Sequence, residues 1–170
     1  TMTPSPKSPY AVTKLVGEYY CRVFAEVYGL STCSLRYFNV FGPRQNPKSQ
    51  YAAVIPAFID ALLKKTPPNI YGDGEQTRDF CYVGNVVKAS LLAATSERLL
   101  KGEMINIACG ESISLNAMLA EMQKILGTSI SPHYLPARPG DVRDSLADIS
   151  AAKSLISYTP DLYFKDALAL

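Results

Sequence analysis

The chain has 170 residues, of which 48% are hydrophobic and 19% charged, and its formal net charge at pH 7 is +2. This length and composition are typical of a globular chain that buries a substantial core, which excludes a disordered protein. The basic residues are scattered, so no nucleic-acid or anionic-membrane surface is expected. No apolar run approaches the length of a membrane span and the first residues are polar and proline-rich, so the sequence predicts a cytoplasmic protein.

The cysteines and the histidine exclude two classes of enzyme. Cys21, Cys33, Cys81 and Cys109 match no zinc or redox spacing and are predicted to be small buried apolar side chains. His133 is the only histidine of the chain, so there is no His/Cys ligand cluster and no histidine for a Ser/His/Asp triad. These patterns exclude a metallohydrolase and a serine hydrolase, and no metal is expected.

The first predicted element is a helix from Pro9 to about Tyr28. Ser8 suits the N-cap, Pro9 suits the first turn, and Gly29 ends the helix. Its apolar residues cover more than the stripe of about 100° that a surface helix needs. We therefore expect this helix to be buried on two sides, one of them against a partner subunit.

The remaining pattern alternates strands with helices, as in an α/β fold. Gly72-Asp73-Gly74 is predicted to make a hairpin-like turn between two strands, and Asn85, Ser114 and Asp148 are predicted helix caps. The chain opens on Thr1 and stops in a helix-like segment at 167–170, as expected for part of a longer protein. The predicted strands are 31–37, 69–71, 78–82, 104–107 and 133–135, and the predicted helices are 54–65, 85–96, 115–126 and 149–156.

Tyr10 and Lys14 form a Tyr-x-x-x-Lys pair. The i, i+4 spacing places the phenol and the ammonium on one face of a helix, where the cation favours the phenolate and the pair can move a proton. Taken alone, the pattern favours a tyrosine packed in the core beside a solvated lysine.

Four motifs in order along the chain change that balance. The chain contains S-P-Y-A-V-T-K, L-R-Y-F-N-V-F-G-P-R-Q, Y-G-D-G-E-Q-T-R-D-F-C-Y-V and R-P-G-D-V-R-D-S-L-A-D. Together they resemble the extended short-chain dehydrogenase/reductase family, and within it the NAD-dependent nucleotide-sugar epimerases that act on UDP-N-acetylglucosamine at C4. The resemblance implies the C-terminal half of a Rossmann-like α/β fold, without the N-terminal dinucleotide-binding half. Residues 1–50 would be the last part of the Rossmann-like domain and 51–170 mostly the small α/β substrate-binding domain, with a helix-strand return near 84–108.

The resemblance also implies roles for individual residues. In these epimerases the tyrosine removes a proton from the sugar O4 while NAD accepts the C4 hydride, and the 4-keto sugar then takes the hydride back on its other face. By this resemblance Tyr10 is the base, Lys14 holds the nicotinamide ribose, and Tyr37 and Phe38 line the nicotinamide pocket. Asn39, Arg78 and Arg138 match contacts to the diphosphate, and Asp141 matches an acceptor for a ribose or sugar hydroxyl. The positions that line the nucleotide and sugar are matched by Gln45, Ala53, Val54 and Tyr71. Asp79 is interpreted as structural.

Ser145 bears on the substrate. It matches a position where related epimerases carry either a bulky aromatic or a small residue, and the small form leaves room for an N-acetyl group. The resemblance thus implies interconversion of UDP-N-acetylglucosamine and UDP-N-acetylgalactosamine. A UDP-glucuronate 4-epimerase and a nucleotide-sugar dehydratase or decarboxylase are the alternatives within the family.

The chain departs from the family pattern in what it lacks. It has no G-x-G-x-x-G turn and no segment to carry the Ser/Thr that the family places upstream of its tyrosine. We therefore expect the isolated chain to bind NAD poorly and to be inactive, whereas the full-length form is expected to be a homodimer through the first helix. A non-catalytic fragment that binds UDP-sugar or self-associates is the alternative of another class.

Overall fold

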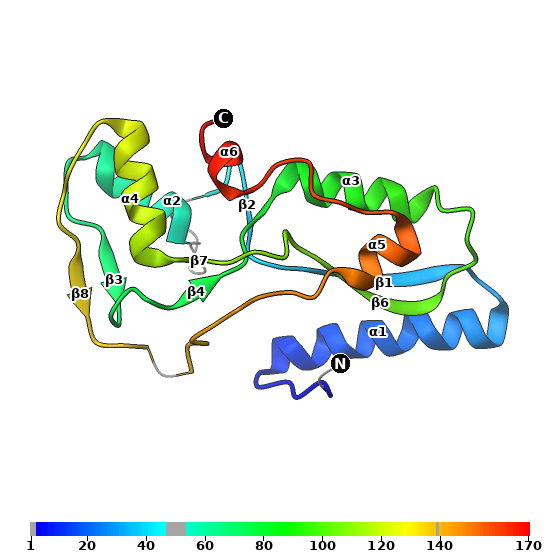
Figure 1. Ribbon diagram of the computed structural model, residues 1–170. Helices are drawn as coiled ribbons and strands as arrows, with labels where there is room; N and C mark the ends of the chain where they lie inside the picture. Colours follow the sequence, from blue (N-terminus) through cyan, green and yellow to red (C-terminus); the bar gives the residue numbers. More distant parts are fainter. Residues whose placement is uncertain (1–2, 47–53, 139) are drawn as a thin grey trace.

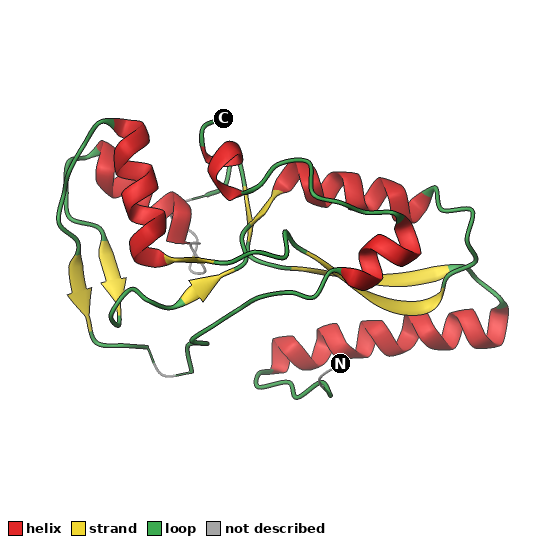
Figure 2. Ribbon diagram, in the orientation of Figure 1, coloured by secondary structure: helices red, strands yellow, loops and turns green. Residues whose placement is uncertain are grey.

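The computed structural model describes residues 3–46, 54–138 and 140–170. Figure 1 shows an elongated arrangement, with a long helix and a strand pair toward one end and a helix pair with a second strand pair toward the other. Short strands join the two ends, and Figure 2 shows that much of this middle part is loop. The residues of the predicted site come mostly from this middle part.

The first helix, α1 (Pro9–Tyr28), confirms the prediction from the sequence. The Ser8 Oγ accepts a hydrogen bond from the Ala11 N–H at 3.1 Å, and Gly29 ends the helix with a φ of +67°. Both signals are local, so they act without help from the rest of the fold.

A parallel strand pair lies against α1. Strand β1 (Thr32–Tyr37) pairs with β6 (Lys101–Ile107), and the two strands pack on α1. Helices α3 (Val83–Ala94) and α5 (Ser150–Ile156) lie on the opposite side of the pair (Figure 1). Side chains from β6, α3, α5 and adjoining segments form a core of Cys81, Ala89, Leu100, Ile105, Ile107, Ala152, Ile156 and Tyr158.

Close packing of α1 depends on one glycine. Gly102 in β6 has a φ of +79°, and a Cβ there would collide with the backbone of Arg22 in α1. In the other direction α1 has no cover: none of its residues is buried, and Tyr20 and Val27 are 61% and 65% exposed. Within this chain α1 therefore packs on one side only, against β1 and β6, and the predicted burial on two sides is not reached.

A second core forms at the other end of the molecule. Helices α2 (Val54–Leu63) and α4 (Leu115–Leu126) pack together, and β3 (Asn69–Tyr71) pairs in parallel with β8 (His133–Leu135). The Ser114 hydroxyl caps α4 and Gly127 ends it, as predicted. Helix α6 (Phe164–Leu168) adds Phe164 and Ala167 to this core.

The predicted hairpin at Gly72-Asp73-Gly74 is wrong. β3 pairs with β8, and the predicted strand 78–82 is two short strands with different partners. β4 (Thr77–Arg78) pairs antiparallel with β7 (Ile113–Ser114), whereas β5 (Cys81–Tyr82) pairs in parallel with β2 (Val40–Phe41). The division falls at Asp79, whose carboxylate binds backbone N–H groups in the interior.

The predicted cap at Asn85 is also wrong. Helix α3 begins two residues earlier, and Asn85 is buried within its first turn. Its Oδ1 accepts from the N–H groups of Asp161 and Leu162 at 3.0 and 3.3 Å, and its Nδ2 donates to the Leu162 carbonyl at 2.7 Å. This asparagine therefore ties the C-terminal segment to α3. Helix α5 begins at Ser150, and the predicted cap Asp148 accepts from its N–H at 2.9 Å.

Within the three described ranges, no helix is both long and apolar enough to cross a membrane.

Candidate functional site

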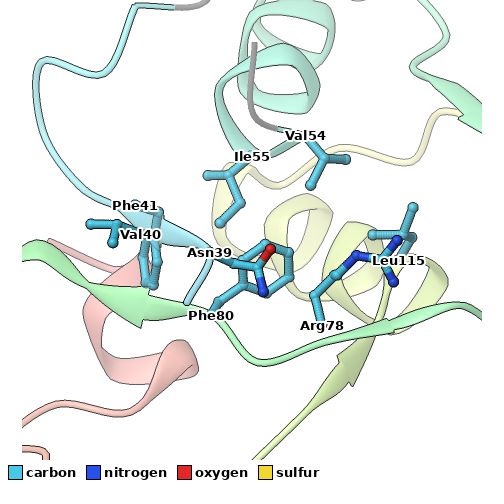
Figure 3. Close-up of a pocket in the computed structure, with 8 residues that line it drawn as sticks. All are labelled: Asn39, Val40, Phe41, Val54, Ile55, Arg78, Phe80 and Leu115. Carbon is cyan, nitrogen blue, oxygen red and sulfur yellow. The ribbon is translucent and has the colours of Figure 1, made fainter. Parts of the chain in front are cut away.

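Two adjoining cavities lie beside the short central strands. The first has a volume of about 220 Å³, and Figure 3 shows Val54 and Ile55 on one side of it with Asn39, Arg78 and Phe80 on the other. The second, of about 570 Å³, shares Val54 and Leu115 with the first. It is also lined by Tyr71, Gln76, Arg138 and Asp141.

Arg78 is held in place by three hydrogen bonds. Its side chain is 15% exposed, its Nη1 donates to the carbonyls of Thr77 and Arg143 at 2.7 and 3.3 Å, and its Nη2 donates to Asp141 Oδ1 at 2.6 Å. A guanidinium fixed in this way is a preorganised donor for an anion in the first cavity.

Arg138 reaches the second cavity in a different manner. Its guanidinium carbon lies 3.7 Å from the centroid of the Tyr71 ring, and the residue is exposed. Tyr71 ends strand β3, and its carbonyl accepts from Gln76 Nε2 at 2.5 Å. Two arginines from separate segments thus face adjoining cavities.

A segment at 141–147, called the strap here, lies along β4. The Thr77 N–H donates to the Arg143 carbonyl at 2.9 Å, and the Ser145 N–H donates to the Thr77 carbonyl at 3.1 Å. The Thr77 hydroxyl also donates to Asp144 Oδ1 at 2.9 Å. The strap therefore carries Asp141 to the second cavity, whereas Ser145 lies beside β4 and lines neither cavity.

A further ion pair joins the strap to the turn after β3. Arg143 Nη1 contacts Asp73 Oδ1 at 2.7 Å, and its hydrogen bond holds the pKa of the Asp73 carboxyl below its usual value. Both partners are exposed, so this link is weak.

Asp79 lies behind the site and is fully buried. Its Oδ1 accepts from the Cys109 N–H at 3.0 Å, and its Oδ2 accepts from Gly110 and Ala147 N–H at 3.0 and 3.2 Å. Burial raises the pKa of the Asp79 carboxyl, and the three N–H donors act against that rise. This carboxylate connects Arg78, its neighbour in sequence, to the end of β6 and to the strap.

Of the other predicted residues, Asn39 and Val54 line the first cavity, and Gln45 is hydrogen-bonded to its wall at Val40. Asn39 Nδ2 donates to the Asp79 carbonyl at 2.9 Å, so its amide is oriented by the backbone between β4 and β5. Gln45 Nε2 donates to the Val40 carbonyl at 3.2 Å, and its Oε1 is buried without a partner. Val54 lines both cavities, whereas Ala53 lies outside the described residues.

Tyr10 and Lys14 lie at the start of α1, apart from both cavities. The Lys14 Nζ is 5.1 Å from the Tyr10 ring centroid, and Tyr10 is 70% exposed. The hydrogen bonds between Thr32 and Cys21 and between Arg36 and Glu18 show that β1 runs antiparallel to α1. The pair therefore lies at the end of the sheet where β1 ends, the usual ligand-binding end of a parallel sheet.

The aromatic residues predicted for the nicotinamide follow at that end. Tyr37 is 51% exposed, and its hydroxyl lies 3.2 Å from the Ser90 hydroxyl. Phe38 packs against Ala108, Ala147 and Ile149. The structure thus forms two groups of predicted residues, one around the arginines and one at the end of β1.

Sequence reasoning missed part of the cavity walls. Phe80 and Leu115 line the first cavity, and Gln76 lines the second. Gln76 is 5% exposed and its Oε1 has no hydrogen-bond partner. Its place in G-D-G-E-Q-T-R, two residues before Arg78, was the one available signal.

A family match and a relative of known sequence both relate this chain to epimerases. Residues 1–108 match the NAD-dependent epimerase/dehydratase family. A provisionally named UDP-glucose 4-epimerase of Methanocaldococcus jannaschii is 40% identical over 164 residues, which cover 96% of this chain and 52% of that protein.

Two solved structures extend the comparison to the fold. UDP-N-acetylglucosamine 4-epimerase from Methanobrevibacter ruminantium M1, in complex with UDP-N-acetylmuramic acid, matches with a TM-score of 0.93 and 46% identity over 99% of this chain and 54% of that chain. UDP-glucuronic acid 4-epimerase from Bacillus cereus, in complex with UDP-glucuronic acid and NAD, matches with a TM-score of 0.87 and 36% identity over 98% of this chain and 52% of that chain.

These matches confirm the predicted α/β fold and the predicted resemblance to epimerases. The chain spans about half the length of the relatives that it matches, consistent with the C-terminal half expected from the motifs. Because the family match covers well over half of the residues, the chain belongs to the NAD-dependent epimerase/dehydratase family.

Proposed function

We propose that this chain is the UDP-sugar-binding half of an NAD-dependent epimerase that interconverts UDP-N-acetylglucosamine and UDP-N-acetylgalactosamine at C4 through a 4-keto intermediate. The observation that carries the proposal is the convergence of Arg78 and Arg138 on adjoining cavities. Similar structures hold UDP-sugars, which supports the same class of ligand here.

The diphosphate is the anchor of such a ligand. Two adjacent anionic phosphates require charge-assisted donors, and an arginine fork suits them better than any other side chain. Arg78 is already oriented by Thr77, Arg143 and Asp141, so little side-chain entropy remains to be lost on binding. Asp141 would accept a hydroxyl of the ribose or the sugar, and Asn39 would contact the diphosphate.

The proton transfer would be carried out by Tyr10 and Lys14, which lie apart from the two arginines. Tyr10 would take the proton from the sugar O4 and return it after the 4-keto sugar has turned, and Lys14 would keep the phenol oriented on the same helix face. When bound, NAD supplies the hydride acceptor and donor for C4. Ser145 on the strap would leave room for the N-acetyl group, and Gln45, Ala53 and Val54 would line the nucleotide and sugar.

The residues present fit one part of NAD. Tyr10 and Lys14 at the start of α1 and Tyr37 and Phe38 at and after the end of β1 lie toward the same end of the sheet, where they would contact the nicotinamide and its ribose. The chain has no G-x-G-x-x-G turn for the pyrophosphate. We therefore propose that turnover requires the part of the relatives that this chain does not match, and that the isolated chain binds UDP-sugar without catalysing epimerisation.

The open apolar side of α1 supports a further part of the proposal. Its exposed residues include Tyr20, Val23 and Val27, which recur on one face of the helix. We propose that this face is the homodimer contact of the full-length form.

Nucleotide binding tests the proposal on the chain itself. UDP at about a hundred times its Kd should raise the melting temperature by about 5 °C or more. Arg138→Ala should abolish most of this rise because one diphosphate donor is lost, whereas Arg98→Ala, at an exposed arginine that lines neither cavity, should keep it. A wild-type chain that shows no shift with UDP, or an Arg138→Ala chain with the full shift, would contradict the proposal.

A further inference from the structure

The contact between Arg138 and Tyr71 covers one face of an aromatic ring inside the larger cavity. The guanidinium carbon is 3.7 Å from the ring centroid, the separation of two stacked planar groups. Both residues line the second cavity. A planar ligand group that stacks on this face of Tyr71 therefore has to displace the guanidinium.

Part of the cavity wall suits such a planar group. Ala57, Phe58, Ala61, Pro67 and Pro68 supply apolar lining, and the ion-paired Asp60 and Lys64 also lie in the wall. Aromatic rings bind nucleic-acid bases by stacking, since every base has a π-face. The backbone that carries the ring is held in place, because the Tyr71 carbonyl accepts from Gln76 Nε2 at 2.5 Å and the next N–H donates to the Leu135 carbonyl at 2.8 Å.

Arg138 is held much less firmly than Arg78. Among the described residues, the Tyr71 ring is the partner of its guanidinium, and no hydrogen bond or ion pair accompanies that contact. Arg78, by contrast, donates three hydrogen bonds. A cation–π contact at an exposed position is weaker than a charge-assisted hydrogen bond to phosphate. A diphosphate is thus able to draw Arg138 away from the ring.

We infer that Arg138 occupies the base-stacking face of Tyr71 in the free chain and leaves it for the diphosphate, so that the site selects uridine carrying phosphates over uridine alone. This inference rests on the proposed UDP-sugar function and adds a specificity role to it. The phosphates and the base then bind together: the phosphates remove the guanidinium, and the base takes the vacated ring face. A nucleoside without phosphates has to compete with Arg138 and gains nothing from displacing it.

The inference predicts opposite effects of one substitution on two ligands. Chemical-shift titrations of the ¹⁵N-labelled chain with uridine and with UDP would measure both affinities. In Arg138→Ala the affinity for UDP should fall at least about tenfold, whereas the affinity for uridine should rise about two- to fivefold because the competitor is gone. In Arg138→Lys, which keeps the charge without the planar group, UDP should lose less and uridine should still gain.

Two controls test whether the gain in uridine affinity comes from uncovering the Tyr71 ring. Arg98→Ala should change neither affinity. In Tyr71→Leu the stacking face is absent, so adding Arg138→Ala to it should no longer raise the affinity for uridine. An uridine affinity that is unchanged or lower in Arg138→Ala would overturn the inference while leaving the proposed function intact. A wild-type chain that binds no UDP would instead reject the proposed function.

Discussion

At the scale of single residues, the buried carboxylate of Asp79 organises the site without lining either cavity. It accepts three backbone N–H groups from two segments distant in sequence, the end of β6 and the strap. Because burial raises its pKa, the folded chain takes up a proton here more readily than the unfolded chain. The proton-linked part of its contribution to stability is therefore full below the ordinary carboxyl pKa and is lost as the pH rises through the raised value, whereas the three N–H hydrogen bonds persist in the carboxylate.

Replacing this carboxylate tests its structural role. In Asp79→Asn either orientation of the amide turns an NH₂ group toward at least one backbone N–H, so one or more buried donors lose their acceptor. We expect the free energy of unfolding at neutral pH to fall by about 3 kcal/mol, measured by urea denaturation. Asp60→Asn, which removes an exposed partner of Lys64, should change it by less than about 0.5 kcal/mol. Equal effects of the two substitutions on the free energy of unfolding would refute the structural role of the Asp79 carboxylate.

At the scale of elements, the C-caps of α1, α4 and α5 adopt the left-handed conformation. Gly29, Gly127 and Ser157 have φ values of +67°, +61° and +54°. Glycine adopts this conformation without cost, whereas a side chain meets steric strain there. Ser157 is therefore a strained end to α5, and Gly127 is an unstrained end to α4.

Exchanging these residues should have opposite effects. Ser157→Gly should raise the free energy of unfolding by about 0.5 kcal/mol, because the relief of strain exceeds the added entropy of the unfolded chain. Gly127→Ser should lower it by about 1 kcal/mol. A Cβ at Gly127 meets nothing within 4 Å, so that loss would come from the backbone alone. Thermal denaturation of both variants measures these two changes in stability. A loss of stability in Ser157→Gly would show that the backbone at Ser157 is not strained.

At the scale of the whole molecule, the open side of α1 exposes a row of large apolar side chains. One side of this helix packs on β1 and β6, and the other exposes Tyr20 and Val27 among further apolar residues. Contiguous exposed apolar patches of this kind usually mark an interface. The proposed homodimer contact would bury this surface.

Self-association of the chain tests that contact. Sedimentation velocity should show an oligomer for the wild type and a monomer for the double variant Tyr20→Glu, Val27→Glu, because two buried, unpaired charges oppose the contact. The control Leu91→Glu, Leu99→Glu adds the same charge at exposed apolar residues outside α1 and should leave the oligomer intact. A wild-type chain that stays monomeric at high concentration would argue against α1 as the contact.

Part of this molecule was determined by the sequence alone. The bounds of α1 and α4 follow from Ser8, Gly29, Ser114 and Gly127, because capping groups act within one turn of their own helix. The motifs likewise placed Arg78, Arg138 and Tyr71 among the site candidates, and the structure brings these to adjoining cavities. Their roles in binding remain predictions.

Only the tertiary structure decided the rest. The separation of β4 from β5 and the use of Asn85 as an anchor depend on partners 24 or more residues away in sequence, at Cys109, Ala147 and Leu162. The stacking of Arg138 on Tyr71 also joins distant segments. A local pattern cannot contain such pairings, because the free energy of a buried polar group depends on which donors and acceptors the fold brings within hydrogen-bond distance.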